Sequence, residues 1–301
     1  RCSGGVCEQM GKLVGASCIC SDIQLHGTEC ICDVRSLGIQ GMGVSMKIIV
    51  LVKQVPNTWG ERTLNTATGQ LDRAASDSVI DEIDERALEV ALHYKDAHDA
   101  EVIALSMGPS SVTEVLRKSL AMGADSALHV KDDALSGSDL SRTAAVLAAA
   151  ITKSGFDLVI AGNEATDGRG GVIPAMIAEH LGVPSMTYLD SAEFSPGSIS
   201  GVRGDEHGTV AVHASLPAVV SITEASAEPR FPNFKGIMRA KKKPLEVWSL
   251  ADLGLDESGY APSTEVTSTT ERPARTAGTK IVDEGNAGNQ LAEFLAAGRL
   301  I

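Results

Sequence analysis

A glycine-rich segment, GNEATDGRGG at residues 162–171, has the composition of a loop that binds phosphate. Gly168, Gly170 and Gly171 would allow the backbone to approach an anion closely. The segment follows the apolar run FDLVIAG and precedes VIPAMIAEHLG, so it connects a predicted strand to a predicted helix. The first turn of that helix would present unpaired N–H groups to an anion. A connection that binds nothing can have the same composition, so both interpretations stay open.

The usual nucleotide-binding sequence motifs do not decide between a phosphate-binding loop and a connection that binds nothing. Neither G-x-G-x-x-G nor a Walker P-loop occurs in the sequence. A second polar cluster is the acidic turn from Asp81 to Glu85, which precedes Ala87, Leu88 and Ala91 at helical spacing. Its carboxylates suit the positive end of a helix dipole. The acidic turn therefore predicts the start of a helix.

The elements that would position these clusters alternate along the chain. Four apolar runs, KIIVLV, AEVIALSM, SALHV and FDLVIAG, are separated by helical patterns that begin near Asp81, Ser110 and Asp139. This alternation predicts an α/β fold with a mostly parallel sheet and helices on both faces. Ligands of such sheets bind at the carboxyl ends of the strands, which is where the glycine-rich loop would lie.

From residue 201 onward, the sequence predicts fewer helices and strands. GVRGDEHGTVAVHASLPAVVSIT predicts a polar turn region followed by two short strands. Residues 224–247 are rich in Pro, Lys and Arg, and residues 256–279 are rich in Ser, Thr, Pro and Glu, which is typical of an arm. A short terminal helix carries Leu291, Phe294 and Leu295 on one face and needs a surface to pack on. We therefore predict an α/β domain at 46–235 and an extended C-terminal arm and helix at 236–301 for subunit contact.

Residues 1–45 differ from the rest of the chain. All six cysteines lie in the first 32 residues, and Cys18, Cys20, Cys30 and Cys32 could be drawn as a zinc site, although their internal spacing is short for one. The preferred interpretation is an appended leader, disordered or non-native, that precedes a domain beginning at Met46. The segment lacks the apolar region of a secretory signal and is too acidic for a transit peptide.

The net charge and the hydropathy pattern argue against two classes of function, broad nucleic-acid binding and membrane insertion. The formal net charge of −13 opposes broad binding to nucleic acid. The most apolar window is interrupted by Gln40 and Lys47, so direct membrane insertion is not expected.

Five blocks in order carry a resemblance to a known family: KIIVLVKQVPNTW, SMGPSSVTEVLRKSLAMGAD, IAGNEATDGRGGVIPAMIAEHLGVP, SLPAVVSITEASAEPRFPNFKGIMRAKKKPLEVWSLADLGL, and RTAGTKIV with the terminal helix. Over essentially all of residues 46–301, the sequence resembles the β subunit of an electron-transfer flavoprotein. The resemblance implies an adenine-nucleotide α-hydrolase-like sheet and a heterodimer whose α subunit holds most of the FAD, while the β subunit binds a structural AMP.

The resemblance also implies the partners. Electrons would pass from acyl-CoA and related dehydrogenases toward the membrane-bound electron-transfer flavoprotein–quinone oxidoreductase, and the subunit would not catalyse a reaction alone. The expected location is a bacterial cytoplasm, because the sequence does not resemble a transit peptide. Some family members bind a second FAD and split electron pairs, and this possibility stays open. An ATP-using hydrolase and a free-standing nucleotide sensor are competing hypotheses from different functional classes, although the loop lacks the lysine of a phosphate-transfer site.

Carried over by position, the AMP site falls on the tips of the predicted strands. Its residues are Leu51, Asp81, Glu82, Ile83, Asp84, Val112, Gly162, Asn163, Glu164, Ala165, Thr166, Asp167, Gly168, Arg169, Gly170, Gly171, Val172 and Ile173. Backbone amides of residues 167–171 and the helix start at Val172 are the candidates for holding phosphate. Backbone groups of the strand would hold adenine, while the simpler explanation for Leu51 and Val112 is ordinary core packing.

The sequence departs from the family pattern in two places. Arg169 replaces an acidic residue and Val172 replaces a glutamine, so Arg169 is either a phosphate ligand or a solvated loop charge. The second departure lies in the predicted partner-binding segment, which comprises Glu224, Ala225, Ser226, Ala227, Glu228 and Arg230. Where animal members place a leucine that enters a dehydrogenase, this segment has no large apolar side chain. Arg230 could approach the flavin or the subunit boundary.

A basic run, Arg239, Lys241, Lys242 and Lys243, follows this segment in an otherwise acidic protein. A solvated face and a patch for acidic partners or the α subunit are its two explanations.

Overall fold

The computed structural model describes residues 45–60, 62–73, 75–195, 197–256, 262–270, 273–275 and 277–301. The predicted leader at 1–45 lies outside these ranges except for Ser45, and so do the four cysteines that could bind zinc. None of the described helices is both long enough and apolar enough to cross a bilayer.

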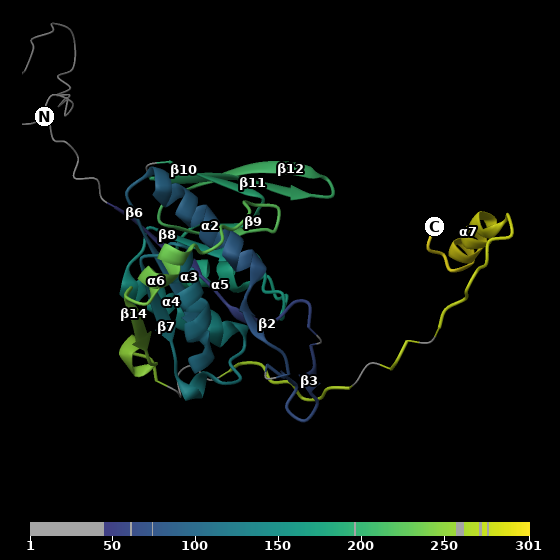
Figure 1. Ribbon diagram of the computed structural model, residues 1–301, viewed down its shortest axis with the longest axis horizontal. Helices are drawn as coiled ribbons and strands as arrows, with labels where there is room; N and C mark the ends of the chain where they lie inside the picture. The colour runs from purple at the N-terminus through teal and green to yellow at the C-terminus, as the bar shows by residue number, and fades with distance from the viewer. Residues whose placement is uncertain are drawn as a thin grey trace, which may run out of the picture.

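A seven-stranded sheet forms the centre of the molecule (Figure 1). Its strand order is β14-β7-β6-β1-β8-β13-β9, and every neighbouring pair is parallel. The strands are β1 (Met46–Leu51), β6 (Ala100–Met107), β7 (Ser126–Val130), β8 (Leu158–Gly162), β9 (Ser185–Leu189), β13 (Ala218–Ile222) and β14 (Leu245–Trp248). The four apolar runs identified in the sequence form β1, β6, β7 and β8, as predicted.

Helices cover both faces of this sheet, which confirms the predicted α/β class. The helices of this body are α2 (Glu82–Ala97), α3 (Thr113–Met122), α4 (Leu140–Ser154), α5 (Ile173–Leu181) and α6 (Phe234–Ala240), with 3₁₀ turns η2 (Ser110–Val112), η3 (Asp133–Leu135) and η4 (Ala251–Leu253). A further helix, α7 (Ala287–Ala297), lies away from the body (Figure 1). Successive residues of β1 point to opposite faces, so Ile48 packs in the core under α2 and α3, and Ile49 in the core under α4 and α5.

Smaller sheets are attached to this body. An antiparallel sheet joins β10 (Ser191–Ser195), β11 (Ser198–Asp205) and β12 (Gly208–Ser215), while β2 (Gln54–Pro56) pairs with β5 (Ser78–Ile80) and β3 (Leu64–Asn65) with β4 (Gln70–Leu71). Residues 201–205, which were predicted as part of a polar turn region, belong to strand β11, because they pair with β12.

The α/β body continues past the predicted boundary at residue 235. Strand β14 pairs with β7 at the edge of the main sheet, and α6 packs beside α3. The last lysine of the basic run belongs to this packing, since Lys243 Nζ donates to the carbonyl oxygens of Leu120 (3.1 Å), Gly123 (3.4 Å) and Ala124. A cation at these carbonyls stabilises the C-terminal end of α3. Burial lowers the pKa of Lys243, which is not a solvated charge.

The arm after the body lies along its surface before it leaves (Figure 1). Asp139 caps α4 by accepting from the Arg142 N–H at 2.8 Å, and its other oxygen accepts from the N–H groups of Ser263 (2.6 Å) and Thr264 (2.9 Å). Further along, the Thr269 hydroxyl donates to the Thr66 carbonyl at 2.9 Å. One carboxylate therefore both starts a helix and anchors the arm.

We expect the arm to detach from α4 in acid. The Arg142 N–H is the largest cause of the lowered pKa of Asp139, with the Ser263 and Thr264 donors adding to it. A carboxyl whose pKa is lower in the folded state contributes stability above its unfolded pKa of about 4, and this contribution is lost as pH falls through the folded pKa. The protection of the Ser263 and Thr264 amides, measured relative to their intrinsic exchange rates, should therefore fall below about pH 4.

The variant Asp139→Ala should show the same loss of amide protection at pH 7 and lose about 1 kcal/mol of stability through the missing helix cap. Unchanged protection of the two amides in this variant would contradict the anchoring role.

Candidate nucleotide-binding site

The glycine-rich loop lies where the sheet reverses its direction of growth. From β1 the chain passes through α2 to β6 on one side, and from β7 it returns through α4 to β8 on the other side of β1. The carboxyl ends of β1 and β8 therefore border the crevice at which open α/β sheets bind ligands. Helix α5 starts after the loop with no side-chain cap, and Pro174 lies in its first turn. Its first-turn N–H groups thus receive no capping side chain.

Asp81 connects the acidic turn to this loop. Its side chain is completely buried and caps α2 by accepting from the Ile83 N–H at 3.0 Å. Its second oxygen accepts from both the N–H and the hydroxyl of Thr166, each at 2.7 Å. Asp81 thus fixes the first half of the loop to the start of α2.

Asp84, one turn further along α2, joins the tips of the two central strands. Its oxygens accept from the N–H of Lys53 at 2.8 Å and from the N–H of Gly162 at 3.0 Å. Burial, and then the charge of Asp81, raise the pKa of Asp84 well above its usual range. A Cβ at Gly162 would lie 2.6 Å from Asp84 Oδ1, so only glycine allows this approach.

Asp167 forms ion pairs with two cations, Lys53 and Arg73. Its carboxylate is 2% exposed and accepts from Lys53 Nζ at 2.8 Å and from an Arg73 guanidinium nitrogen at 2.9 Å. Burial would raise the pKa of Asp167, but these hydrogen bonds and charges outweigh it, so the pKa is lowered. Both cations remain almost half exposed, with side-chain exposures of 44% and 45%. They therefore keep donors for another anion.

A third cation, Arg62, holds the loop from the same side. Its guanidinium donates to the carbonyl oxygen of Thr166 and, at 3.2 Å, to the Thr166 hydroxyl. Sequence reasoning missed Lys53, Arg62 and Arg73. Lys53 could have been found, because it lies two residues after the end of the central strand β1. No local signal relates Arg62 and Arg73 to a loop more than 90 residues away.

The remaining predicted site residues divide into exposed and buried groups. Arg169 has an exposed side chain, a positive φ of 49° and an ion pair to Glu164 at 3.3 Å. Gly171 (φ 64°) accepts a hydrogen bond from the Tyr188 hydroxyl at 3.2 Å, and a Cβ there would lie 2.2 Å from that hydroxyl. Asn163 Oδ1 is buried and has no hydrogen-bond partner within the described structure.

Leu51 and Val112 are buried and pack in the cores on opposite faces of the sheet. Only their backbone groups could therefore contribute to a nucleotide site. In the acidic turn, Ile83 is buried against Gly162 while Glu82 is exposed. The other residues named from the sequence are exposed or partly exposed: Ala165, Gly168, Gly170 and Val172 in the loop, and Ile173 at the start of α5.

The predicted partner-binding segment follows β13 and is tied to α2. The Arg86 guanidinium donates to the carbonyls of Ser226 and Ala227 at 3.0 and 3.2 Å and pairs with Glu228 at 3.1 Å.

Arg230 is the last residue of this segment, and its side chain is attached more strongly to α2. Its guanidinium binds both oxygens of Glu89 at 2.8 Å and Asp96 at 2.8 Å. Bidentate charged hydrogen bonds of this kind are among the strongest in proteins. Arg230 is thus held on α2, and Glu224 and Ala225 lie in the stretch of loop between β13 and these contacts.

Comparison with known proteins agrees with this architecture. Residues 68–253, more than half of the chain, match the electron transfer flavoprotein domain. The chain is 49% identical to the electron transfer flavoprotein subunit beta of Mycobacterium tuberculosis, over 84% of this chain and 99% of that protein. It is 33% identical to the subunit of the same name from Megasphaera elsdenii (85% and 100% covered) and 35% identical to the caffeyl-CoA reductase-Etf complex subunit CarD of Acetobacterium woodii (84% and 97%). The chain therefore belongs to the electron transfer flavoprotein family as a β subunit, an electron-carrying subunit rather than a stand-alone enzyme.

Proposed function

We propose that this β subunit binds AMP in the crevice between β1 and β8 and helps to enclose an FAD held mainly by the α subunit. The heterodimer would carry electrons from acyl-CoA and related dehydrogenases toward electron-transfer flavoprotein–quinone oxidoreductase. Its proposed location is a bacterial cytoplasm, consistent with the bacterial relatives. The observation that carries the nucleotide proposal is the uncapped start of α5, which follows a loop pinned by three carboxylates at the reversal point of the sheet.

The residues present fit a bound nucleotide rather than a hydrolytic centre. Asp81, Asp84 and Asp167 all accept hydrogen bonds from protein donors in the described structure, so their oxygens serve the loop and not a metal ion. AMP would place its phosphate near the amides of residues 167–173, with its adenine against the backbone at the ends of β1 and β6. The bound FAD would supply the redox chemistry, and this chain would position and shield it.

The arm and α7 support a role in subunit contact. Leu291 and Phe294 on α7 are 50% and 56% exposed, and α7 lies away from the α/β body at the end of the extended arm (Figure 1). An isolated helix of this length is marginal in water, so its apolar face needs a partner surface. We assign that surface to the α subunit.

The test is to co-express residues 46–301 with the α-subunit gene, purify the complex, denature it and quantify the released FAD and AMP. One FAD and one AMP per heterodimer are expected. Two FAD and no AMP would replace the proposal with the electron-splitting form, and absence of both flavin and heterodimer would refute it.

Lys53 and Arg73 are expected to supply the charge that distinguishes AMP from adenosine. Their free donors lie beside the loop that would hold the phosphate, and a charged hydrogen bond to phosphate contributes about 1.5 kcal/mol or more. In a heterodimer stripped of AMP, Lys53→Gln and Arg73→Gln should each weaken AMP binding by about tenfold or more and leave adenosine binding nearly unchanged.

Calorimetric titration with both ligands measures this difference. Arg203→Gln, at an exposed position on β11, is the matched control and should bind AMP normally. Equal losses of AMP and adenosine affinity would mean that the two cations only hold the loop.

A further inference from the structure

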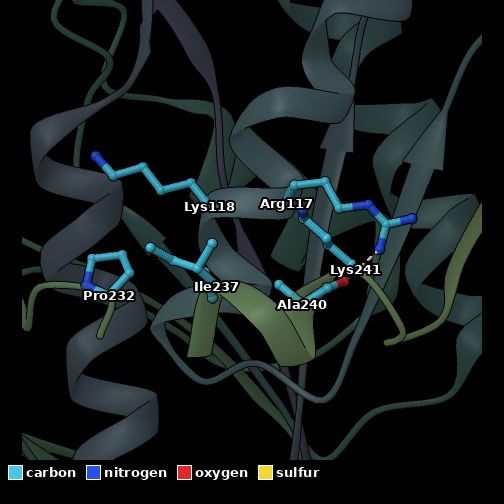
Figure 2. A pocket seen from close by; sticks show the side chains of 7 residues that line it. Arg117, Lys118, Pro232, Ile237, Ala240 and Lys241 are labelled. Carbon is cyan, nitrogen blue, oxygen red and sulfur yellow. Dashed lines mark hydrogen bonds between the residues drawn. The ribbon is translucent and has the colours of Figure 1, made fainter. Parts of the chain in front are cut away.

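A cavity of about 660 Å³ lies between α3 and α6, away from the glycine-rich loop (Figure 2). Its lining residues lie between positions 117 and 121 and between positions 232 and 241. None of them belongs to the loop at residues 162–171, so this cavity is not the candidate nucleotide site. The groups that would hold a nucleotide in place therefore have to lie around the loop itself.

One tyrosine reaches this loop from the edge of the main sheet. Tyr188 lies in β9, the outermost strand on one side, and its hydroxyl donates to the carbonyl oxygen of Gly171 at 3.2 Å. Strand β13 separates β9 from β8, the strand that precedes the loop. The tyrosine side chain therefore extends back past one strand to contact the end of the loop.

The backbone of Tyr188 is arranged for this reach. The register between β9 and β13 shifts here, so Ser221 alone faces two residues of β9, Thr187 and Tyr188. Such a β-bulge redirects a side chain. Tyr188 has a φ of 60°, which is strained for a residue with a Cβ, and its N–H donates to the buried Ser221 Oγ at 2.9 Å. The fold thus keeps a strained tyrosine at a position where glycine would adopt the same φ without strain.

The hydrogen bond to Gly171 fixes the direction of the next N–H group. The peptide between Gly171 and Val172 is trans, so its N–H points away from its carbonyl and hence away from Tyr188. Among the described residues, no protein group accepts a hydrogen bond from the Val172 N–H. Pro174 supplies no N–H to the first turn of α5, so the donors at this helix start are few. The direction of the Val172 N–H therefore matters for an anion that binds there.

We propose that Tyr188 is a positioning residue of the nucleotide site, which holds the peptide between Gly171 and Val172 so that its N–H faces the nucleotide phosphate. The inference rests on the proposed nucleotide-binding function and adds a residue to that site. Lys53, after β1, holds Asp167 from one side of β8, and Tyr188 holds Gly171 from the other side. Tyr188 acts through the Gly171 carbonyl, so its removal should affect ligands that carry a phosphate.

The test uses the heterodimer stripped of AMP and calorimetric titration with AMP and with adenosine. Tyr188→Phe retains the ring and loses the hydrogen bond, so its affinity for AMP should fall about fivefold while its affinity for adenosine stays unchanged. Tyr188→Gly removes the side chain without straining the backbone and should lose at least as much AMP affinity. Tyr94→Phe is the matched control, because it removes a phenol hydroxyl from a ring that packs on His98 and Phe194, and it should bind both ligands normally.

The two ligands separate positioning of the phosphate donor from general support of the fold. A loss of affinity for AMP alone supports the inference. Unchanged AMP affinity in Tyr188→Phe would overturn it while the nucleotide proposal stands. Equal losses for AMP and adenosine would also overturn it, because Tyr188 would then stabilise the fold and not the phosphate contact. If the unmodified heterodimer bound neither ligand, the proposed function would fail and the inference with it.

Discussion

Replacing Asp84 with alanine is expected to lower the free energy of unfolding by about 3 kcal/mol and to release bound AMP. The change leaves the N–H groups of Lys53 and Gly162 without their acceptor in a buried place, and each such group costs about 1–3 kcal/mol. It also frees the tips of the two strands that form the crevice. Denaturant unfolding and AMP release from the purified heterodimer measure the two effects.

Glu82→Ala is the matched control for this prediction. Glu82 lies in the same first turn of α2 and also has a carboxyl group, but its side chain is exposed. Its removal should cost about 0.5 kcal/mol through the helix dipole alone. Similar losses in the two variants would show that Asp84 does not fasten the strands.

The pH dependence of stability gives a further check on Asp84. A carboxyl whose pKa is raised in the folded state binds its proton more tightly there than in the unfolded chain. Its contribution to stability therefore falls as pH rises from about 4, the unfolded pKa, through the raised folded value. Asp84→Asn cannot titrate, so the stability difference between this variant and the unmodified protein should change across that interval.

Replacing Arg230 with alanine is expected to cost about 2 kcal/mol and to loosen the partner-binding segment. Glu89 has only 8% of its surface exposed and would lose its bidentate partner. Breaking a fully buried ion pair costs about 3–5 kcal/mol, and the value is reduced here because the Arg230 side chain is 32% exposed. Thermal unfolding and hydrogen exchange of residues 224–230 in the heterodimer measure the change.

Two further variants define what Arg230 does. Arg230→Lys retains the charge but not the planar fork, and should have an intermediate stability. Arg169→Ala removes an exposed ion pair and should change stability by less than about 0.5 kcal/mol. If Arg230→Ala left stability and exchange unchanged but shifted the flavin absorbance, the arginine would serve the flavin rather than the fold.

The seven-stranded body could be predicted in large part because its signals are local. The apolar runs at β1, β6, β7 and β8 are continuous because parallel strands are buried on both faces. Asp81 and Asp139 cap the helices that follow them, and Gly123 and Gly155 end α3 and α4. Each of these features depends on residues within one or two turns of each other.

The position of the candidate site followed from the same local signals together with a general rule. Once Gly162–Val172 was placed between a strand and a helix, the rule that ligands bind at the carboxyl ends of parallel strands located it. The contacts that hold the loop in place could not be predicted in this way. Asp84 contacts Gly162 across 78 residues and Asp167 contacts Lys53 across 114, and no spacing pattern in the sequence relates them.

The sequence by itself determined the α/β class, the family, the helix caps and the segment that would hold a nucleotide. Only the tertiary structure decided which polar residues hold that segment, that Arg230 is bound to Glu89, that Lys243 caps α3, and that β14 completes the sheet beyond residue 235. The physical reason is the separation along the chain between the residues that interact. Periodicity, capping and turn chemistry act between neighbours along the chain, whereas a buried ion pair or a cap supplied from 120 residues away exists only once packing has removed water from between its partners.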